Sequence, residues 1–123
     1  LYPDLLAGLK DVDPGNQYLV PYMWGTTGIG LNVEKVRAAL GKDAPLDSWA
    51  LLFDPANAAK LAGCGIAVLD DETEGLGAAF LYLGKPINAG GKADLDAAIA
   101  LFAKVRPHIR YFHSSRYIED LAN

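Results

Sequence analysis

The sequence has little cysteine, no long apolar run and no basic leader. Its single cysteine, Cys64, cannot form a disulfide within the chain, and an unpaired thiol would be unusual in an exported protein. Cys64 is therefore expected to be either a core residue or half of a disulfide whose other half lies outside this chain. Apolar stretches such as 66–69 and 97–103 are far shorter than the roughly 20 residues that span a bilayer. No signal peptide is expected within these residues, because the N-terminus lacks a basic segment followed by an apolar run.

Basic residues are also scarce relative to acidic ones, at 11 against 15, which leaves a net charge of −4. An acidic chain matches nucleic acid poorly, so no nucleic-acid partner is expected. His108 and His113 are five residues apart and lack further ligands at metal-binding spacing, so neither a metal nor a cofactor is expected. Apolar residues, by contrast, make up 51% of the chain, which predicts one globular domain, or part of one, with a substantial core.

Short apolar runs alternate with helical patterns, and this alternation predicts an α/β fold. Pro55 at a first helical position, the capping residues Asn32 and Asp54, and either Ser114 or Ser115 mark helix starts. Strands are expected at 18–22, 28–31, 65–69 and 109–112, the third of them buried. Helices are expected at 3–12, 33–40, 49–53, 55–63, 94–105 and 116–122, and another is expected to follow the acidic run 70–74 and to end at 83. In the helix at 94–105, Leu95, Ile99 and Phe102 are expected to face inward.

The acidic residues Asp70, Asp71, Glu72 and Glu74 stand where a predicted strand passes into a helix. Ligands of open α/β sheets gather beyond the carboxyl ends of the strands, and carboxylates there could hold an ammonium group by charge-assisted hydrogen bonds. Acidic residues in a first turn also complement the helix dipole, for roughly 0.3–1 kcal/mol each. Taken alone, the residues favour this structural role. A hydrolase with paired carboxylates would need further groups that the sequence does not supply.

Three other patterns point to structural roles. The glycine-rich segment 25–30 matches neither the phosphate-binding loop nor the dinucleotide fingerprint, so it is expected to be flexible or closely packed backbone. Ser114 and Ser115 follow His113, but no Gly-x-Ser-x-Gly elbow surrounds them, which favours a capping role over a nucleophile. The aromatic residues at 18, 22 and 24 could stack on a ligand, although the core is their more usual place.

Several segments together resemble the putrescine- and spermidine-binding proteins of bacterial ABC transporters, in the same order and spacing. Each segment alone would be a weak signal, and the combination covers nearly the whole chain. The segments are VPYMWGTTGIGLN at 20–32 with EKV at 34–36, APLDSW at 44–49, CG at 64–65 continuing to LD at 69–70, YLG at 82–84, RPHIRYFHSS at 106–115, YI at 117–118 and DLAN at 120–123.

The resemblance implies part of a two-lobed type II periplasmic-binding-protein fold, with the ligand between the lobes. Residues 1–24 would end the first lobe, 25–30 would cross a hinge, and 31–123 would form the first, incomplete part of the second lobe. The implied function is capture of putrescine or spermidine in the periplasm and delivery to the permease of an ABC importer in the inner membrane. No catalysis is implied, and the full-length protein is expected to be monomeric.

The resemblance also implies roles for individual residues. Glu74 matches a family glutamate that binds a ligand amine, and Asp71 matches an aspartate of spermidine-preferring members. The chain departs from many relatives at Glu72, where proline is common, and at Gly75 and Gly77. The family tends to have a second cysteine just beyond the equivalent of residue 123, which could pair with the cysteine of this chain. Ligand binding by Glu74, with Asp71 second, thereby becomes the favoured interpretation.

Two alternatives stay open from the sequence. One is a binding protein of the same fold for another solute, such as an amino acid, iron or thiamine. The other is an enzyme or regulator that uses a related lobe.

Overall fold

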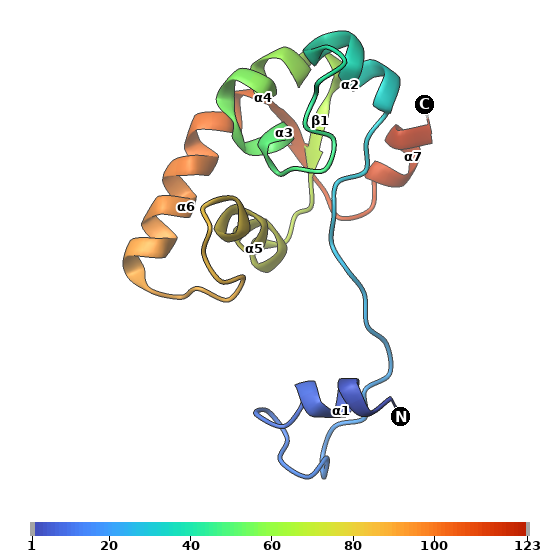
Figure 1. The fold of residues 1–123 in the computed structure, drawn as a ribbon, viewed down its shortest axis with the longest axis vertical. Helices are drawn as coiled ribbons and strands as arrows, with labels where there is room; N and C mark the ends of the chain where they lie inside the picture. The colour runs from blue at the N-terminus through green and yellow to red at the C-terminus, as the bar shows by residue number, and fades with distance from the viewer. Residues whose placement is uncertain (1, 123) are drawn as a thin grey trace.

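Helices surround a two-stranded sheet in the computed structural model, which describes residues 2–122 and confirms the predicted α/β class (Figure 1). None of the helices described is long and apolar enough to cross a membrane. The elements in chain order are α1 (Pro3–Gly8), α2 (Val33–Leu40), α3 (Ala50–Phe53), α4 (Pro55–Leu61), the 3₁₀ helix η1 (Ala62–Cys64), β1 (Ile66–Val68), α5 (Glu72–Tyr82), α6 (Lys92–Val105), the 3₁₀ helix η2 (Arg106–His108), β2 (Ile109–Phe112) and α7 (Tyr117–Ala122).

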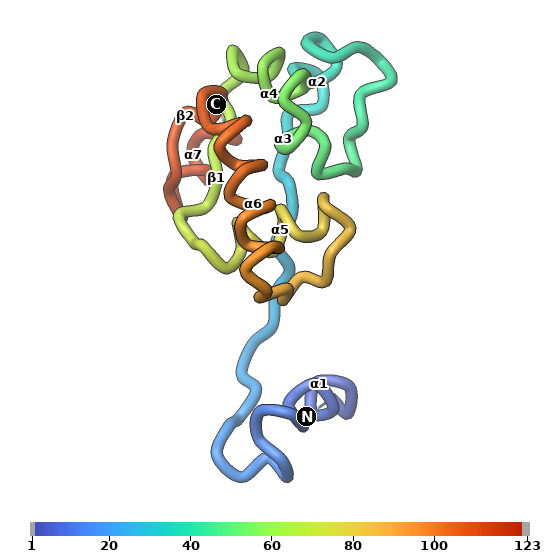
Figure 2. Tube along the Cα trace, turned by 90° about the vertical axis from the view of Figure 1, so that its left-hand side faces the viewer, coloured from blue at the N-terminus to red at the C-terminus, as the bar shows by residue number. Residues whose placement is uncertain are grey.

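The sheet pairs β1 with β2 in parallel, and α5 and α6 form the crossover between them (Figure 2). Ile66 lies opposite Ile109 and Val68 opposite Phe112, with an irregularity after Ile66. The two strands expected at 65–69 and 109–112 are thus confirmed. The expectation that the first of them is buried is wrong, because Ala67 is exposed. Within residues 2–122 the edge of β1 away from β2 has no partner strand.

The two strands expected at 18–22 and 28–31 are not present. Residues 20–31 run as an extended segment, and no backbone hydrogen bond joins them to any other part of residues 2–122. Strand formation requires a neighbour for the ladder, and Pro21 has no N–H to donate. The segment connects α1 and its loop, at one end of the molecule, to the helical body at the other (Figure 1).

Helix starts follow the sequence signals closely. The Asn32 side chain accepts a hydrogen bond from Lys35 N at 3.0 Å, and the Asp54 carboxylate accepts one from Ala56 N at 2.8 Å ahead of α4. The first helix is shorter than expected, since α1 ends at Gly8. The end of α5 is closed by Gly84, which has φ +69° and lets Lys85 N reach Phe80 O at 2.8 Å.

The main core lies between α3, α5, α6 and the sheet. Phe53 and Val105 are its largest fully buried side chains. The inward face of α6 carries Ala98, Leu101 and Val105, a spacing of three and four residues that follows one side of a helix. Ile99 was expected inward, but this expectation is wrong, because its side chain is 60% exposed. One residue along a helix is a rotation of about 100°, which carries position 99 off the buried face.

A buried carboxylate organises the loop after α1. Asp13 is the buried charged residue of that region, and its oxygens accept backbone hydrogen bonds from Gln17 at 3.1 Å and from Tyr18 and Leu19 at 2.8 Å each. The hydrogen bond from Tyr18 N–H, helped by those from Leu19 and Gln17, lowers the pKa of the Asp13 carboxyl below its ordinary value, although burial acts in the opposite direction. The ionised carboxylate therefore holds the loop.

Acidification is expected to loosen this loop, and Asp13→Asn is expected to remove most of that response. The folded-state pKa is lowered, so the stabilisation is present above the pKa of the unfolded state and is lost as the pH falls through the folded-state value. Hydrogen exchange of the Tyr18 and Leu19 amides between pH 7 and pH 3, corrected for intrinsic exchange rates, measures the effect. Equal protection at both pH values in the parent protein would contradict this role for Asp13.

Candidate functional site

A groove of about 510 Å³ lies between the extended segment and β1. Its floor is apolar and continuous with the core. Its polar and charged side chains come from the extended segment, from Lys35 on α2, from Cys64 in η1, from the first turn of α5 and from the region around α7. The lining includes Cys64, Glu74, His113, Tyr117 and Asp120.

Glu74 is the predicted ligand residue that the structure places in this groove. Asp71 precedes α5 as its N-cap, so the first turn begins just after the carboxyl end of β1. Glu74 is exposed, and no hydrogen bond or ion pair within residues 2–122 engages its carboxylate. An unengaged carboxylate beside an apolar floor can accept charge-assisted hydrogen bonds from a ligand ammonium group.

Asp71 has a structural task that the sequence also suggested. One oxygen of its carboxylate accepts hydrogen bonds from Thr73 N at 2.9 Å and from Glu74 N at 3.0 Å, which caps α5. Asp71 does not line the groove. Its second oxygen has no partner within residues 2–122, so a ligand role for Asp71 stays a prediction beside its capping role.

The glycines that depart from the family pattern sit where α5 packs closely. A Cβ atom at Gly77 would approach Ile87 Cγ1 to 3.0 Å, and one at Gly75 would lie 3.5 Å from the Phe102 ring. The first distance is tighter than ordinary van der Waals contact. The small residues therefore suit the packing of α5 against its neighbours, and the first turn that carries Glu74 is formed despite them.

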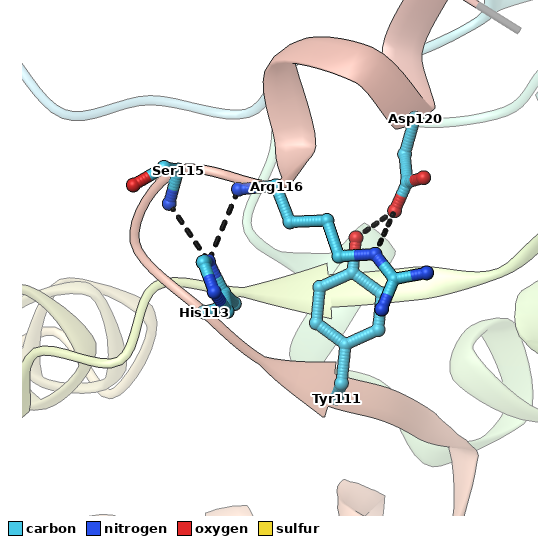
Figure 3. A network of polar contacts seen from close by, with 5 residues as sticks. All are labelled: Tyr111, His113, Ser115, Arg116 and Asp120. Atoms are coloured by element: carbon cyan, nitrogen blue, oxygen red, sulfur yellow. Dashed lines mark hydrogen bonds and ion pairs between the residues drawn. The ribbon is translucent and has the colours of Figure 1, made fainter.

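A polar network borders the groove at the end of β2 (Figure 3). The Nδ1 atom of His113 accepts hydrogen bonds from Ser115 N and Arg116 N, each at 3.1 Å. Asp120 accepts a hydrogen bond from the Tyr111 hydroxyl and lies 4.0 Å from Arg116 Nε. The guanidinium of Arg116 also lies 5.2 Å from the centre of the Tyr111 ring, within cation–π range.

This network corrects the predicted serine cap. The side chain that receives the N–H groups ahead of α7 is the imidazole of His113, and the Ser114 hydroxyl donates to Asp70 O at 3.2 Å. Serine is the commoner capping residue, so the sequence favoured a serine cap over this role of His113. Nor does a sequence pattern indicate Tyr117 and Asp120, whose place in the groove depends on how α7 packs.

The single cysteine and the aromatic residues near the N-terminus are exposed. Cys64 is exposed and lines the groove, with Sγ 4.0 Å from Lys35 O. Of its two expected roles, that of a core residue is therefore wrong, and a disulfide with a cysteine outside this chain stays a prediction. The aromatic side chains Tyr18, Tyr22 and Trp24 are exposed in this chain, and none belongs to the core. No group of three or more potential metal ligands gathers within residues 2–122.

No family model matches the chain. Curated proteins, however, match it along its whole length. It is 53% identical over 123 residues to the putrescine-binding periplasmic protein SpuD of Pseudomonas aeruginosa, with 100% of this chain and 34% of that protein covered. It is 50% identical over 124 residues to the putrescine-binding periplasmic protein PotF of Escherichia coli, again with 100% and 34% covered. The chain thus spans about a third of the length of these curated relatives.

A more distant match is 32% identical over 127 residues to the spermidine/putrescine-binding periplasmic protein of Escherichia coli, with 100% of this chain and 33% of that protein covered. These relatives are named as binding proteins and not as enzymes. The resemblance inferred from the sequence motifs is confirmed by these matches.

Proposed function

We propose that this chain forms part of a periplasmic solute-binding protein that captures a putrescine- or spermidine-type amine and delivers it to an ABC importer. The observation that carries the proposal is the identity of 50–53% along the whole chain to proteins named for putrescine binding. An unengaged carboxylate, that of Glu74, supports it. The permease in the inner membrane is the partner, and the complete protein acts as a monomer.

The proposed division of the chain follows the extended segment. Residues 1–24 end the first lobe, 25–30 cross the hinge, and 31–123 form the first part of the second lobe. The separation of α1 from the helical body in Figure 1 supports this division. Closure of the two lobes around the ligand is the signal that a permease reads, by a hinge movement.

Recognition needs two kinds of contact for a linear amine. An ammonium group donates hydrogen bonds to the Glu74 carboxylate, and Asp71 receives a second one when the ligand is long enough. The methylene chain lies on apolar and aromatic surface, where a cation–π contact adds to the attraction. No bond is made or broken in the ligand, so the protein acts as a receptor and not as an enzyme.

A thermal-shift screen of the complete protein carrying this chain tests the proposal. Putrescine and spermidine are expected to raise the melting temperature, since a ligand at 100 times its Kd stabilises the folded state by about 2.7 kcal/mol. Amino acids, ferric iron and thiamine serve as the alternative solutes of this fold. Stabilisation by one of these, with none from amines, would overturn the proposal in favour of that solute.

A further inference from the structure

The imidazole of His113 has one tautomer that fits its contacts. Two backbone N–H groups, those of Ser115 and Arg116, point at Nδ1 from 3.1 Å each (Figure 3). A backbone N–H can only donate, so Nδ1 must be an acceptor with a free lone pair. The ring proton therefore resides on Nε2, and the contacts require a neutral imidazole.

The turn between β2 and α7, which this imidazole holds, connects the α5 side of the groove to the α7 side. His113 N donates to Val68 O at 2.9 Å, and the Ser114 hydroxyl donates to Asp70 O at 3.2 Å. These bonds tie the turn to the end of β1, immediately before the residue that caps α5. On its other side the turn leads into α7, which brings Tyr117 and Asp120 to the groove.

We propose that neutral His113 is a positioning residue for this groove, and that its protonation releases the turn between β2 and α7. A proton on Nδ1 would convert the acceptor into a donor that faces two other donors, so both hydrogen bonds would be lost together. The effect on the groove follows from geometry alone. Its effect on amine affinity rests on the proposed function.

Charged groups around the imidazole come from several elements. The carboxylates of this region are Glu74 on α5 and Asp120 on α7, which line the same groove as His113, and Asp70 after β1, whose backbone O accepts from the Ser114 hydroxyl. The cations of this region are Arg116, immediately before α7, and Lys35 on α2, which also lines the groove. The other titratable side chains of this region are Cys64, Asp71, Tyr111 and Tyr117.

Three variants of the complete protein separate the effect of losing the hydrogen-bond acceptor at position 113 from the effect of protonating it. In His113→Asn the carboxamide oxygen can accept the same two N–H bonds but does not change charge with pH. In His113→Phe a ring remains without any acceptor. His108→Asn, at the other histidine of this chain, is the matched control, because His108 lies in η2 outside the network.

The backbone amide resonances of Ser115 and Arg116 give the first readout, at pH 8 and pH 5.5. In the parent and in His108→Asn both resonances are expected to shift upfield on acidification, as their hydrogen bonds are lost. In His113→Asn they are expected to keep the pH 8 position at both values, and in His113→Phe to show the released position at both. Unchanged resonances in the parent at pH 5.5, or a parent-like response in His113→Asn, would overturn the inference.

Calorimetric titration with putrescine gives the second readout on the same samples. At pH 8 the affinity of His113→Phe is expected to fall several-fold while His113→Asn stays near the parent value. Between pH 8 and pH 5.5 the parent is expected to lose more affinity than His113→Asn. Equal affinity of His113→Phe and the parent at pH 8 would overturn the positioning role. Absence of putrescine binding in every sample would overturn the proposed function, while the amide resonances would still decide the role of His113.

Discussion

Glu74→Gln in the complete protein is expected to lower putrescine affinity about 10- to 150-fold. The substitution keeps the shape of the side chain and removes the charge that an ammonium group would meet in the groove. Losing one charged hydrogen-bond partner costs roughly 1.5–3 kcal/mol, which corresponds to that range of affinity. Folding stability should change little, because the helix-dipole contribution of a first-turn carboxylate is no more than about 1 kcal/mol. Calorimetric titration with putrescine and spermidine measures the loss.

Two neighbouring carboxylates complete this experiment, Glu72 as the control and Asp71 as a test of ligand length. Glu72→Gln removes the same charge two residues away, at a residue that does not line the groove, and should leave affinity within about threefold. Asp71→Asn preserves a good N-cap while removing the charge, so it should weaken spermidine more than putrescine and leave α5 intact. If Glu74→Gln binds both amines like the parent, or if Glu72→Gln does more damage, the acidic first turn is only a helix start.

Phe53→Ala is expected to cost about 3–5 kcal/mol of folding stability, the typical range for removing a buried aromatic side chain. Phe53 is fully buried, and its ring centre lies 5.1 Å from that of Phe102 in an edge-on arrangement and 5.6 Å from that of Tyr82. The contacts join α3 to α5 and α6, so the cavity would open at the junction of three helices. Urea unfolding of the complete protein measures the change through the midpoint and slope of the transition that involves this domain.

Ile99→Ala is the matched control for the core. Its side chain is 60% exposed, although the helical pattern predicted it to face inward. A substitution at the surface usually changes stability by no more than about 0.5 kcal/mol. Comparable losses in Ile99→Ala and Phe53→Ala would mean that α6 is rotated relative to the face described here.

Local signals in the sequence predicted local structure well. Helix starts at Asn32 and Asp54 depend on hydrogen bonds within four residues, and both formed as expected. The strands expected at 18–22 and 28–31 depend on a partner elsewhere, which an extended pattern cannot supply by itself. On α6 the predicted inward residues Leu95 and Phe102 pack against the core and Ile99 does not. The helix has enough apolar residues to suit more than one orientation, and its neighbours decide which side is buried.

The candidate site likewise combines a residue that the sequence could predict with one that it could not. Glu74 could be predicted because a carboxylate in a first turn after a strand end is visible in the sequence, and the family resemblance pointed to the same residue. His113 could not, since its importance comes from two backbone N–H groups and from the contacts of the next residue with Asp70. A histidine beside two serines carries no pattern that distinguishes a cap from a surface residue.

The unpaired edge of β1 and the extended segment opposite it affect how this chain behaves by itself. Both present backbone N–H and C=O groups without partners inside residues 2–122, and Ile29 adds exposed apolar surface to the segment. Such edges are templates for pairing with a strand of another molecule, which leads to dimers, domain-swapped species or aggregates. In solutions of the isolated chain, self-association would compete with solute binding, and an apparent affinity would vary with protein concentration.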